Sequence, residues 1–344
     1  MAELAAIVLV IGLTAYAVLG GADFGAGFWD LTAGGAERGS RVRGMVKRSM
    51  GPVWEANHVW LIFVLVVMWT CFPPAFAAIM ETLYVPIFLA GVGIILRGAA
   101  FALRGEAGTI GEARALGGIF ALSSVVTPFF LGATIGAVAS GQVPVGEAGP
   151  PFESWTGAVS ILAGVTAIAT GAFLAAVFMA ADSVRAGLPD LVNAFRTRAL
   201  GAGLAAGALA IGGLLVVRAD VPDLFDGLTE GAGLAAVAVS GLAGVASMGL
   251  VATSRFGPAR LTAAIAVGAI LVGMAVAQSP DFLPGELTFA DAAAGHSTLV
   301  ASMIGVAVGL AIILPSLALL FRLTLAGRLD PDFHPIGAAE EDAR

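Results

Sequence analysis

The sequence predicts an all-α, polytopic membrane protein. Of its 344 residues, 58% are hydrophobic and only 12% are charged, and the mean hydropathy is +0.96. A soluble domain carries about 25% charged residues. Apolar runs of about 20 residues recur from one end of the chain to the other, and a helix of that length crosses about 30 Å of hydrocarbon. Glycine and alanine are abundant in these runs, which favours close packing of helices in lipid.

The apolar runs predict nine membrane spans, which together form a single transmembrane domain over residues 1–326. A polar tail over residues 327–344 follows and is predicted to lie in the cytoplasm. The spans are Leu4–Asp23, Val53–Phe72, Leu83–Leu103, Leu116–Ala139, Gly157–Ala181, Ala199–Val217, Leu228–Val251, Leu261–Ala277 and Leu299–Phe321.

The basic residues support this count. With nine spans, every Lys and Arg except Arg218 falls on one side of the membrane, out of 17 in the chain. The connections Gly141–Ser154 and Ser279–Ser297, on the other side, contain Asp and Glu but no Lys or Arg. Basic residues mark the cytoplasmic side. We therefore expect the N-terminus outside and the C-terminus in the cytoplasm.

Cysteine and histidine are too scarce for most metal centres. The chain has one cysteine, Cys71, and three histidines, His58, His296 and His334, which lie far apart in the sequence. An internal disulfide and a cysteine-held cluster are excluded. Haem ligation by this chain alone is not expected. No phosphate-binding loop and no basic, aromatic surface for nucleic acid is present.

The stretch Gly51–Ile62 concentrates polar chemistry at the start of the second span. Pro52 has the backbone angle favoured at the first turn of a helix, so we expect the span to begin there. Glu55 then lies in that turn, and its spacing to His58 places the two side chains on neighbouring faces. Polar groups that enter a bilayer normally face the interior of a helix bundle and have partners there.

Two interpretations of this cluster remain open. Trp54 and Trp60 fit a belt of aromatic residues at the membrane interface, with Glu55 stabilised by the helix N-terminus. Glu55, Asn57 and His58 together fit that interpretation less well. We therefore predict proton transfer by Glu55 and His58, with Trp54, Asn57 and Trp60 in structural roles.

Asp23, at the predicted end of the first span, lies at the same membrane level as Glu55. If the two carboxylates are close, one of them can hold a proton at neutral pH, which suits proton transfer. Asp23 can instead be an ordinary interfacial acid. Arg97, near the end of the third span, either extends to the interface or is the counter-charge of one of these acids. The pair Pro73 and Pro74 is expected to end or kink the second span.

Four segments resemble one known family. Gly51–Ile62 is similar to the Pro-x-Trp-(Asp/Glu)-x-Asn-x-Val-Trp-Leu signature of subunit II of cytochrome bd-type quinol oxidases. Asp23–Gly27 resembles the end of the family's first-helix motif. Phe195–Ala199 is similar to its Arg-Thr-Arg-Ala stretch, and Leu287–Ala293 is similar to its Leu-Thr-x-x-Asp-Ala stretch. The matches fall in the same order as in the family. The second-span signature is the most specific of the four.

The resemblance implies two four-helix bundles plus a peripheral helix. It implies a heterodimer with a haem-bearing subunit I, which holds haem b and haem d, oxidises quinol and reduces O2 to water in the bacterial cytoplasmic membrane. Subunit II ligates no haem, contacts lipid and quinone, and helps deliver cytoplasmic protons. Carried over by position, Glu55 is the acid of the proton pathway and Asp23 is the acid of the first helix.

The chain departs from the family pattern at three positions. Gly20 and Ala22 replace the Asp and Phe of the first-helix motif, and His58 replaces a residue that is often Gln or Glu. Two other functions stay open from the residues alone. One is a proton-coupled transporter that uses Asp23 and Glu55, although a carrier would show two related halves with interrupted helices. The other is a purely structural subunit.

Overall fold

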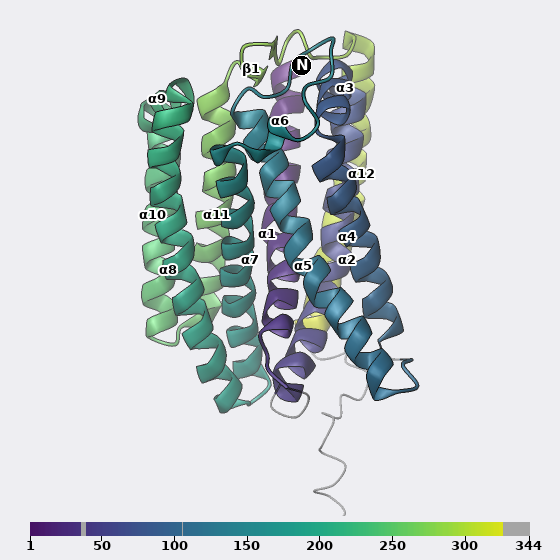
Figure 1. The fold of residues 1–344 in the computed structure, drawn as a ribbon, viewed down its shortest axis with the longest axis vertical. Coiled ribbons are helices and arrows are strands. Elements are labelled where there is room, and N and C mark those ends of the chain that lie inside the picture. Colours follow the sequence, from purple (N-terminus) through teal and green to yellow (C-terminus); the bar gives the residue numbers. More distant parts are fainter. Residues whose placement is uncertain (36–38, 105, 326–344) are drawn as a thin grey trace, which may run out of the picture.

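The fold is a pair of helix bundles capped at one end by short elements (Figure 1). This computed structural model describes residues 1–35, 39–104 and 106–325, so the predicted tail lies outside the described residues. The elements are α1 Ala2–Leu31, α2 Ser40–Cys71, α3 Pro73–Thr82, α4 Tyr84–Leu103, α5 Ile110–Ala139, α6 Glu153–Thr156, α7 Ala158–Arg185, α8 Pro189–Asp220, α9 Pro222–Thr229, α10 Gly231–Ala252, α11 Phe256–Gln278, β1 Asp281–Leu283, β2 Leu287–Thr288 and α12 His296–Leu325.

Each of the nine predicted spans falls on a long helix. Within the described ranges, eight helices are long and apolar enough to cross a membrane: α1, α4, α5, α7, α8, α10, α11 and α12. The ninth candidate is the pair formed by Ala56–Cys71 of α2 and by α3, which is bent by 115°. The all-α, multi-span prediction is confirmed, and so is the break at Pro73 and Pro74, because α3 begins at Pro73.

Two predicted helix boundaries were wrong. α1 continues to Leu31 instead of ending at Asp23, and α2 begins at Ser40, so Pro52 lies inside it and not at its first turn. The physical reason is that the segment before Pro52 is itself amphipathic. Val42, Met45 and Val46 are buried there at helical spacing, although basic residues surround them in the sequence.

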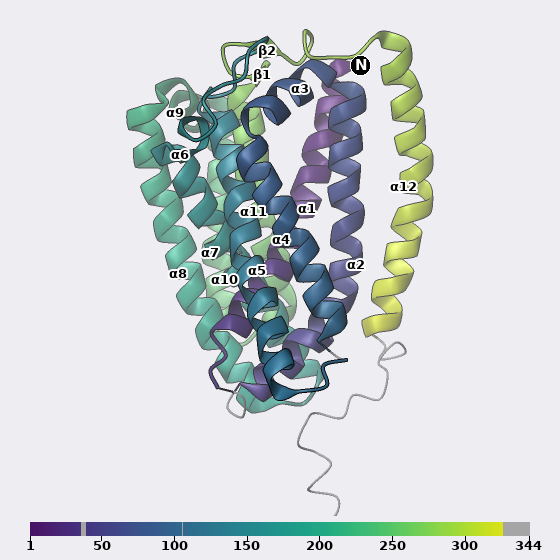
Figure 2. The same cartoon turned by 45° about the vertical axis from the view of Figure 1, so that its right-hand side comes forward.

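The long helices form two bundles, α1, α2, α4 and α5 in the first and α7, α8, α10 and α11 in the second (Figures 1 and 2). α12 stands outside both and packs mainly on α2 (Figure 2). The most apolar stretch of α12 contains no buried residue. The predicted arrangement of two bundles and a peripheral helix is therefore confirmed.

The bundles meet where α1 crosses α7. A methyl group built on Gly25 would lie 1.9 Å from the carbonyl oxygen of Gly171, and one built on Gly171 would lie 2.8 Å from the carbonyl oxygen of Gly21. Trp29 on α1 donates its indole N–H to the carbonyl of Ala172 at 2.8 Å. Only glycine permits backbones to approach this closely, so these positions fix the spacing of the bundles.

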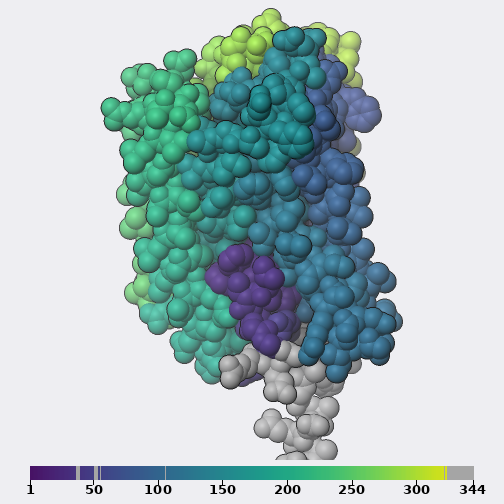
Figure 3. Space-filling view, in the orientation of Figure 1, coloured from purple at the N-terminus to yellow at the C-terminus, as the bar shows by residue number. Residues whose placement is uncertain are grey.

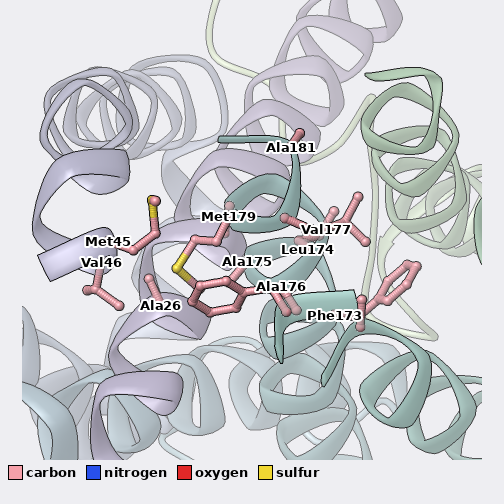
Figure 4. Packing of buried hydrophobic residues seen from close by; sticks show 14 of the residues in the cluster. Ala26, Met45, Val46, Phe173, Leu174, Ala175, Ala176, Val177, Met179 and Ala181 are labelled. Atoms are coloured by element: carbon pink, nitrogen blue, oxygen red, sulfur yellow. The ribbon is translucent and has the colours of Figure 1, made fainter. Parts of the chain in front are cut away.

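The largest buried cluster surrounds this crossing (Figure 4). Met45 and Val46 from α2 and Ala26 from α1 pack against α7, where Leu174 and Met179 are fully buried. Figure 3 shows a purple patch from the first part of the chain at the surface between the two bundles, near the end of the molecule that lies opposite the N-terminus.

The opposite end carries the cap. α3, α6, α9 and the β1–β2 hairpin gather there beside the N-terminus, whereas α12 ends at the far end of the bundles (Figures 1 and 2). The amide of Ala294 donates to the carbonyl of Cys71 at 2.8 Å, and the amide of Gly149 donates to Thr82 at 3.1 Å. These bonds join the long connections to the end of α2 and to α3.

Candidate functional site

A buried ion pair between α1 and α4 is the centre of the polar site. Arg97 donates from Nη2 to Asp23 Oδ1 at 2.5 Å and from Nη1 to Asp23 Oδ2 at 2.6 Å. It also donates to the backbone carbonyl of Asp23 at 3.0 Å. Asp23 is 0% exposed and Arg97 is 2% exposed. Arg97 is therefore the counter-charge of Asp23 and does not extend to the membrane surface.

Side chains from the other two helices of the first bundle complete this pair. Asn57 on α2 donates from Nδ2 to Asp23 Oδ2 at 2.9 Å, and Arg97 donates from Nε to the hydroxyl of Ser124 on α5 at 2.8 Å. The hydroxyl of Ser124 in turn donates a hydrogen bond to the carbonyl oxygen of Phe120 at 2.7 Å. We call Asp23, Asn57, Arg97 and Ser124 the four-helix clasp, because each residue comes from a different helix.

Aromatic rings enclose the guanidinium group. The rings of Phe24 and Phe120 lie 5.0 Å and 4.9 Å from its central carbon, within the range of a cation–π contact. A buried ion pair is costly to desolvate, and removal of one partner leaves an uncompensated charge that costs about 3–5 kcal/mol. The bidentate geometry and the extra hydrogen bonds of the clasp offset that desolvation cost.

His58 lies one residue beyond Asn57 on α2 and lines a small pocket beside the clasp. Its Nδ1 is 2.7 Å from the carbonyl oxygen of Trp54, and its ring centre is 4.7 Å from that of Trp54. A carbonyl oxygen only accepts, so Nδ1 carries a proton and Nε2 is the atom that can gain or lose one. Tyr16 and Arg97 line the same pocket.

The structure does not test the role of Glu55. Its backbone lies in α2, and its side chain is outside the described part of the chain. Trp60 is 8% exposed and packs with Tyr16 and Phe24. Trp54 is half-buried and stacks on Phe101 with ring centres 6.1 Å apart.

Sequence reasoning missed four contributors to this site. Ser124 is one of two adjacent serines in an apolar run, and a polar pair inside a span is the signal that could have identified it. Tyr16 is one of two tyrosines in the chain and lies in the middle of the first span. Its hydroxyl is buried and has no hydrogen-bond partner among the described side chains. Phe24 and Phe120 gave no signal beyond ordinary apolar residues.

Two further acids anchor helix ends near the far end of the bundles. Asp30, 3% exposed, pairs with Arg43 at 2.9 Å and with Arg104 at 2.5 Å, and thus joins α1 to the start of α2 and the residue after α4. Asp182 pairs with Arg185 and Arg260, which joins α7 to α11. Both groups are structural ties between helix ends.

Metal-binding side chains do not gather in the part of the chain that the structure describes. No three His, Cys, Asp or Glu side chains among them converge in a way that could hold a metal ion. The pocket beside His58 is too narrow to hold a ligand, since a water-sized sphere does not fit in it.

Comparison with known proteins decides the family. The model of the family described as "Cytochrome bd terminal oxidase subunit II" matches residues 1–324. The chain belongs to this family. A curated relative, cytochrome bd ubiquinol oxidase subunit 2 of Bacillus subtilis (strain 168), is 28% identical over 126 residues, which cover 37% of this chain and 36% of that relative. The spans and the bacterial relative identify the bd subunit II chain as a multi-span protein of a cytoplasmic membrane.

A solved structure shares the fold of this subunit II chain. It is described as the structure of bd oxidase from Geobacillus thermodenitrificans, and the match has a TM-score of 0.73 at 23% identity. It covers 94% of this chain and 98% of that chain. At this identity the likeness supports the fold alone.

Proposed function

We propose that the chain is the second subunit of a bd-type quinol oxidase that reduces O2 to water. In this proposal it supports a haem-bearing subunit I, which holds haem b and haem d, and it conducts protons from the cytoplasm toward that partner. The match of the subunit II family to residues 1–324 carries the proposal.

Within the chain, Glu55 and His58 are the proposed proton-transferring groups. Two observations support His58: it lines a pocket in the first bundle, and its Nδ1 bond to the carbonyl of Trp54 leaves Nε2 as the ring atom that can exchange a proton. Glu55 is proposed because it is the acid of the second-span signature. It lies three residues before His58 on the same helix. The end of the molecule where α12 stops is the proposed cytoplasmic side, because the ion pairs of Arg43, Arg104 and Arg260 lie at helix ends there.

The partner is tested by purifying the chain with and without the product of the neighbouring gene and recording reduced-minus-oxidised spectra. We expect haem signals and quinol-driven oxygen consumption only in the preparation that contains both subunits. Haem bound by this chain alone would contradict the proposal that subunit I holds the haem groups. Coupled transport of protons and a solute by the chain alone in vesicles would instead support the carrier.

The proton route is tested by Glu55→Gln in the assembled complex. Loss of a proton-transferring group costs about 10²–10⁴ in rate, so we expect oxygen consumption to fall at least about tenfold at unchanged haem content. Glu81→Gln, which neutralises an exposed carboxylate on α3, is the matched control and is expected to leave turnover unchanged. Undiminished turnover in Glu55→Gln would remove Glu55 from the route.

A further inference from the structure

Both oxygens of the buried Asp23 carboxylate accept hydrogen bonds. Oδ1 accepts from Arg97 Nη2, and Oδ2 accepts from both Arg97 Nη1 and Asn57 Nδ2. Protonation would remove the negative charge that faces the buried guanidinium of Arg97 and would leave that guanidinium without a counter-charge. Arg97 itself cannot be deprotonated in a protein. Asp23 and Arg97 therefore carry fixed charges and do not pass a proton along.

Asn57 connects these fixed charges to the turn of α2 that carries the proposed proton route. It lies two residues after Glu55 and one residue before His58. Each residue advances an α-helix by about 100° and about 1.5 Å, so a bond that fixes Asn57 also fixes the rotation and height of its neighbours. Asn57 is 2% exposed, and its Nδ2 bond to Asp23 is the side-chain link from this turn to α1.

We propose that the four-helix clasp positions the proton-transferring turn of α2, and that Asp23 is a permanently ionised positioning residue and not a proton carrier. The inference rests on the proposed function, because it concerns the placement of Glu55 and His58. It reassigns Asp23, which the sequence motif grouped with Glu55 as a second proton-handling acid. It also gives Asn57 and Ser124 roles in proton transfer through the placement of α2.

The first experiment separates a fixed charge from a carrier. Asp23→Asn, Arg97→Gln and the double variant are purified as the complete oxidase, and the yield of assembled complex and its unfolding temperature are measured. Each single variant leaves one buried charge unpaired, so we expect both to lose yield and unfolding temperature. The double variant leaves no charge, and we expect it to recover more than half of that loss.

Two results would overturn the fixed-charge assignment. One is an Asp23→Asn complex with wild-type yield and unfolding temperature but with turnover as low as that of Glu55→Gln, which is the behaviour of a proton carrier. The other is a double variant that is no more stable than the worse single variant, which would show that the pairing of the two charges is not what holds the bundle. If Asp23→Asn does not assemble at all, the yield of the double variant decides: recovered assembly supports the fixed-charge assignment, and no recovery contradicts it.

The second experiment tests positioning with a readout that a purely structural role would not change. Asn57→Ala keeps the Asp23–Arg97 pair and removes its link to α2. Misplacement of a reacting group by about 1 Å can cost about a hundredfold, so we expect turnover to fall roughly tenfold or more, with a displaced pH profile of oxygen consumption. Val64→Ala truncates another buried residue of α2 that is outside the clasp, and its pH profile should match the wild type.

A wild-type pH profile in Asn57→Ala would overturn the positioning role, as would an equal displacement in Val64→Ala. A wild-type complex that consumes no oxygen would overturn the proposed function and the positioning role with it. The two failures are distinguishable, because only the second is visible before any variant is made.

Discussion

The crossing of α1 and α7 can be tested by a single methyl group. In Gly25→Ala the new carbon would lie 1.9 Å from the carbonyl oxygen of Gly171 and 2.7 Å from the amide nitrogen of Ala172. Non-bonded heavy-atom contacts are most favourable at about 3.5–4.0 Å, so the helices have to separate by about 2 Å. The atoms that the methyl group meets are backbone, which has no other rotamer to adopt.

Overpacking of this kind costs about 1–3 kcal/mol, and the rigid backbone places this site at the upper end. The better helix propensity of alanine returns at most about 1 kcal/mol, which leaves a net loss of about 2 kcal/mol. Thermal unfolding of the purified protein in detergent measures it, and we expect the unfolding temperature to fall by several degrees.

Gly118→Ala on α5 is the matched control, because a methyl group there meets no atom within 4 Å. It should leave the unfolding temperature unchanged or slightly raised. Equal unfolding temperatures for Gly25→Ala and Gly118→Ala would refute the reasoning, since they would show that the backbones of α1 and α7 are not in contact at Gly25.

Two further predictions concern the helix ends. Asp30→Asn leaves two guanidinium groups without their buried carboxylate and should destabilise the protein by about 3 kcal/mol, the lower end for a broken buried pair, because both groups are partly exposed. Asp190→Asn breaks a half-exposed pair and should cost under about 1 kcal/mol in the same unfolding assay; equal losses would contradict the burial argument. Thr109→Ala removes the side chain that accepts from the amide of Glu112 and should cost about 1 kcal/mol. Faster hydrogen exchange in the first turn of α5, with unchanged exchange in its middle, would confirm that loss; exchange at the wild-type rate throughout would contradict it.

The spans were predictable because hydropathy is a local property. Each apolar run of about 20 residues became a helix, and Pro73 broke the second one, since a proline cannot donate to the preceding turn. The start of α2 was missed for a local reason as well. Its apolar positions Val42, Met45 and Val46 are separated by basic residues, which lower the average hydropathy while leaving a buried face.

The clasp was only partly predictable. Asp23, Asn57 and Arg97 were each identified from their polarity within or near a span, but the choice between a counter-charge and an interfacial cation for Arg97 depends on which way α4 is rotated. That rotation is fixed by packing against α5, where Ser124 and Phe120 lie. A single sequence contains no direct information about such a rotation.

The glycines at the bundle crossing were equally hidden. Gly25 and Gly171 are far apart in the sequence, and the chain has 47 glycines. Abundant glycine predicts that some helices approach closely. It does not say which pairs do, because that depends on the register in which two helices cross.

One turn of α1, Gly21–Gly25, faces both contacts at once. Asp23 points to the clasp of the first bundle, while Gly21 and Gly25, two residues to either side and so roughly opposite on the helix, touch Gly171 of the second bundle. Rotation of α1 by even part of a turn would break the ion pair on one side and drive side chains into α7 on the other. The rotation and position of α1 are therefore fixed at this level by contacts with both bundles. A rearrangement of either bundle has to leave this level of α1 unchanged or disturb both bundles together.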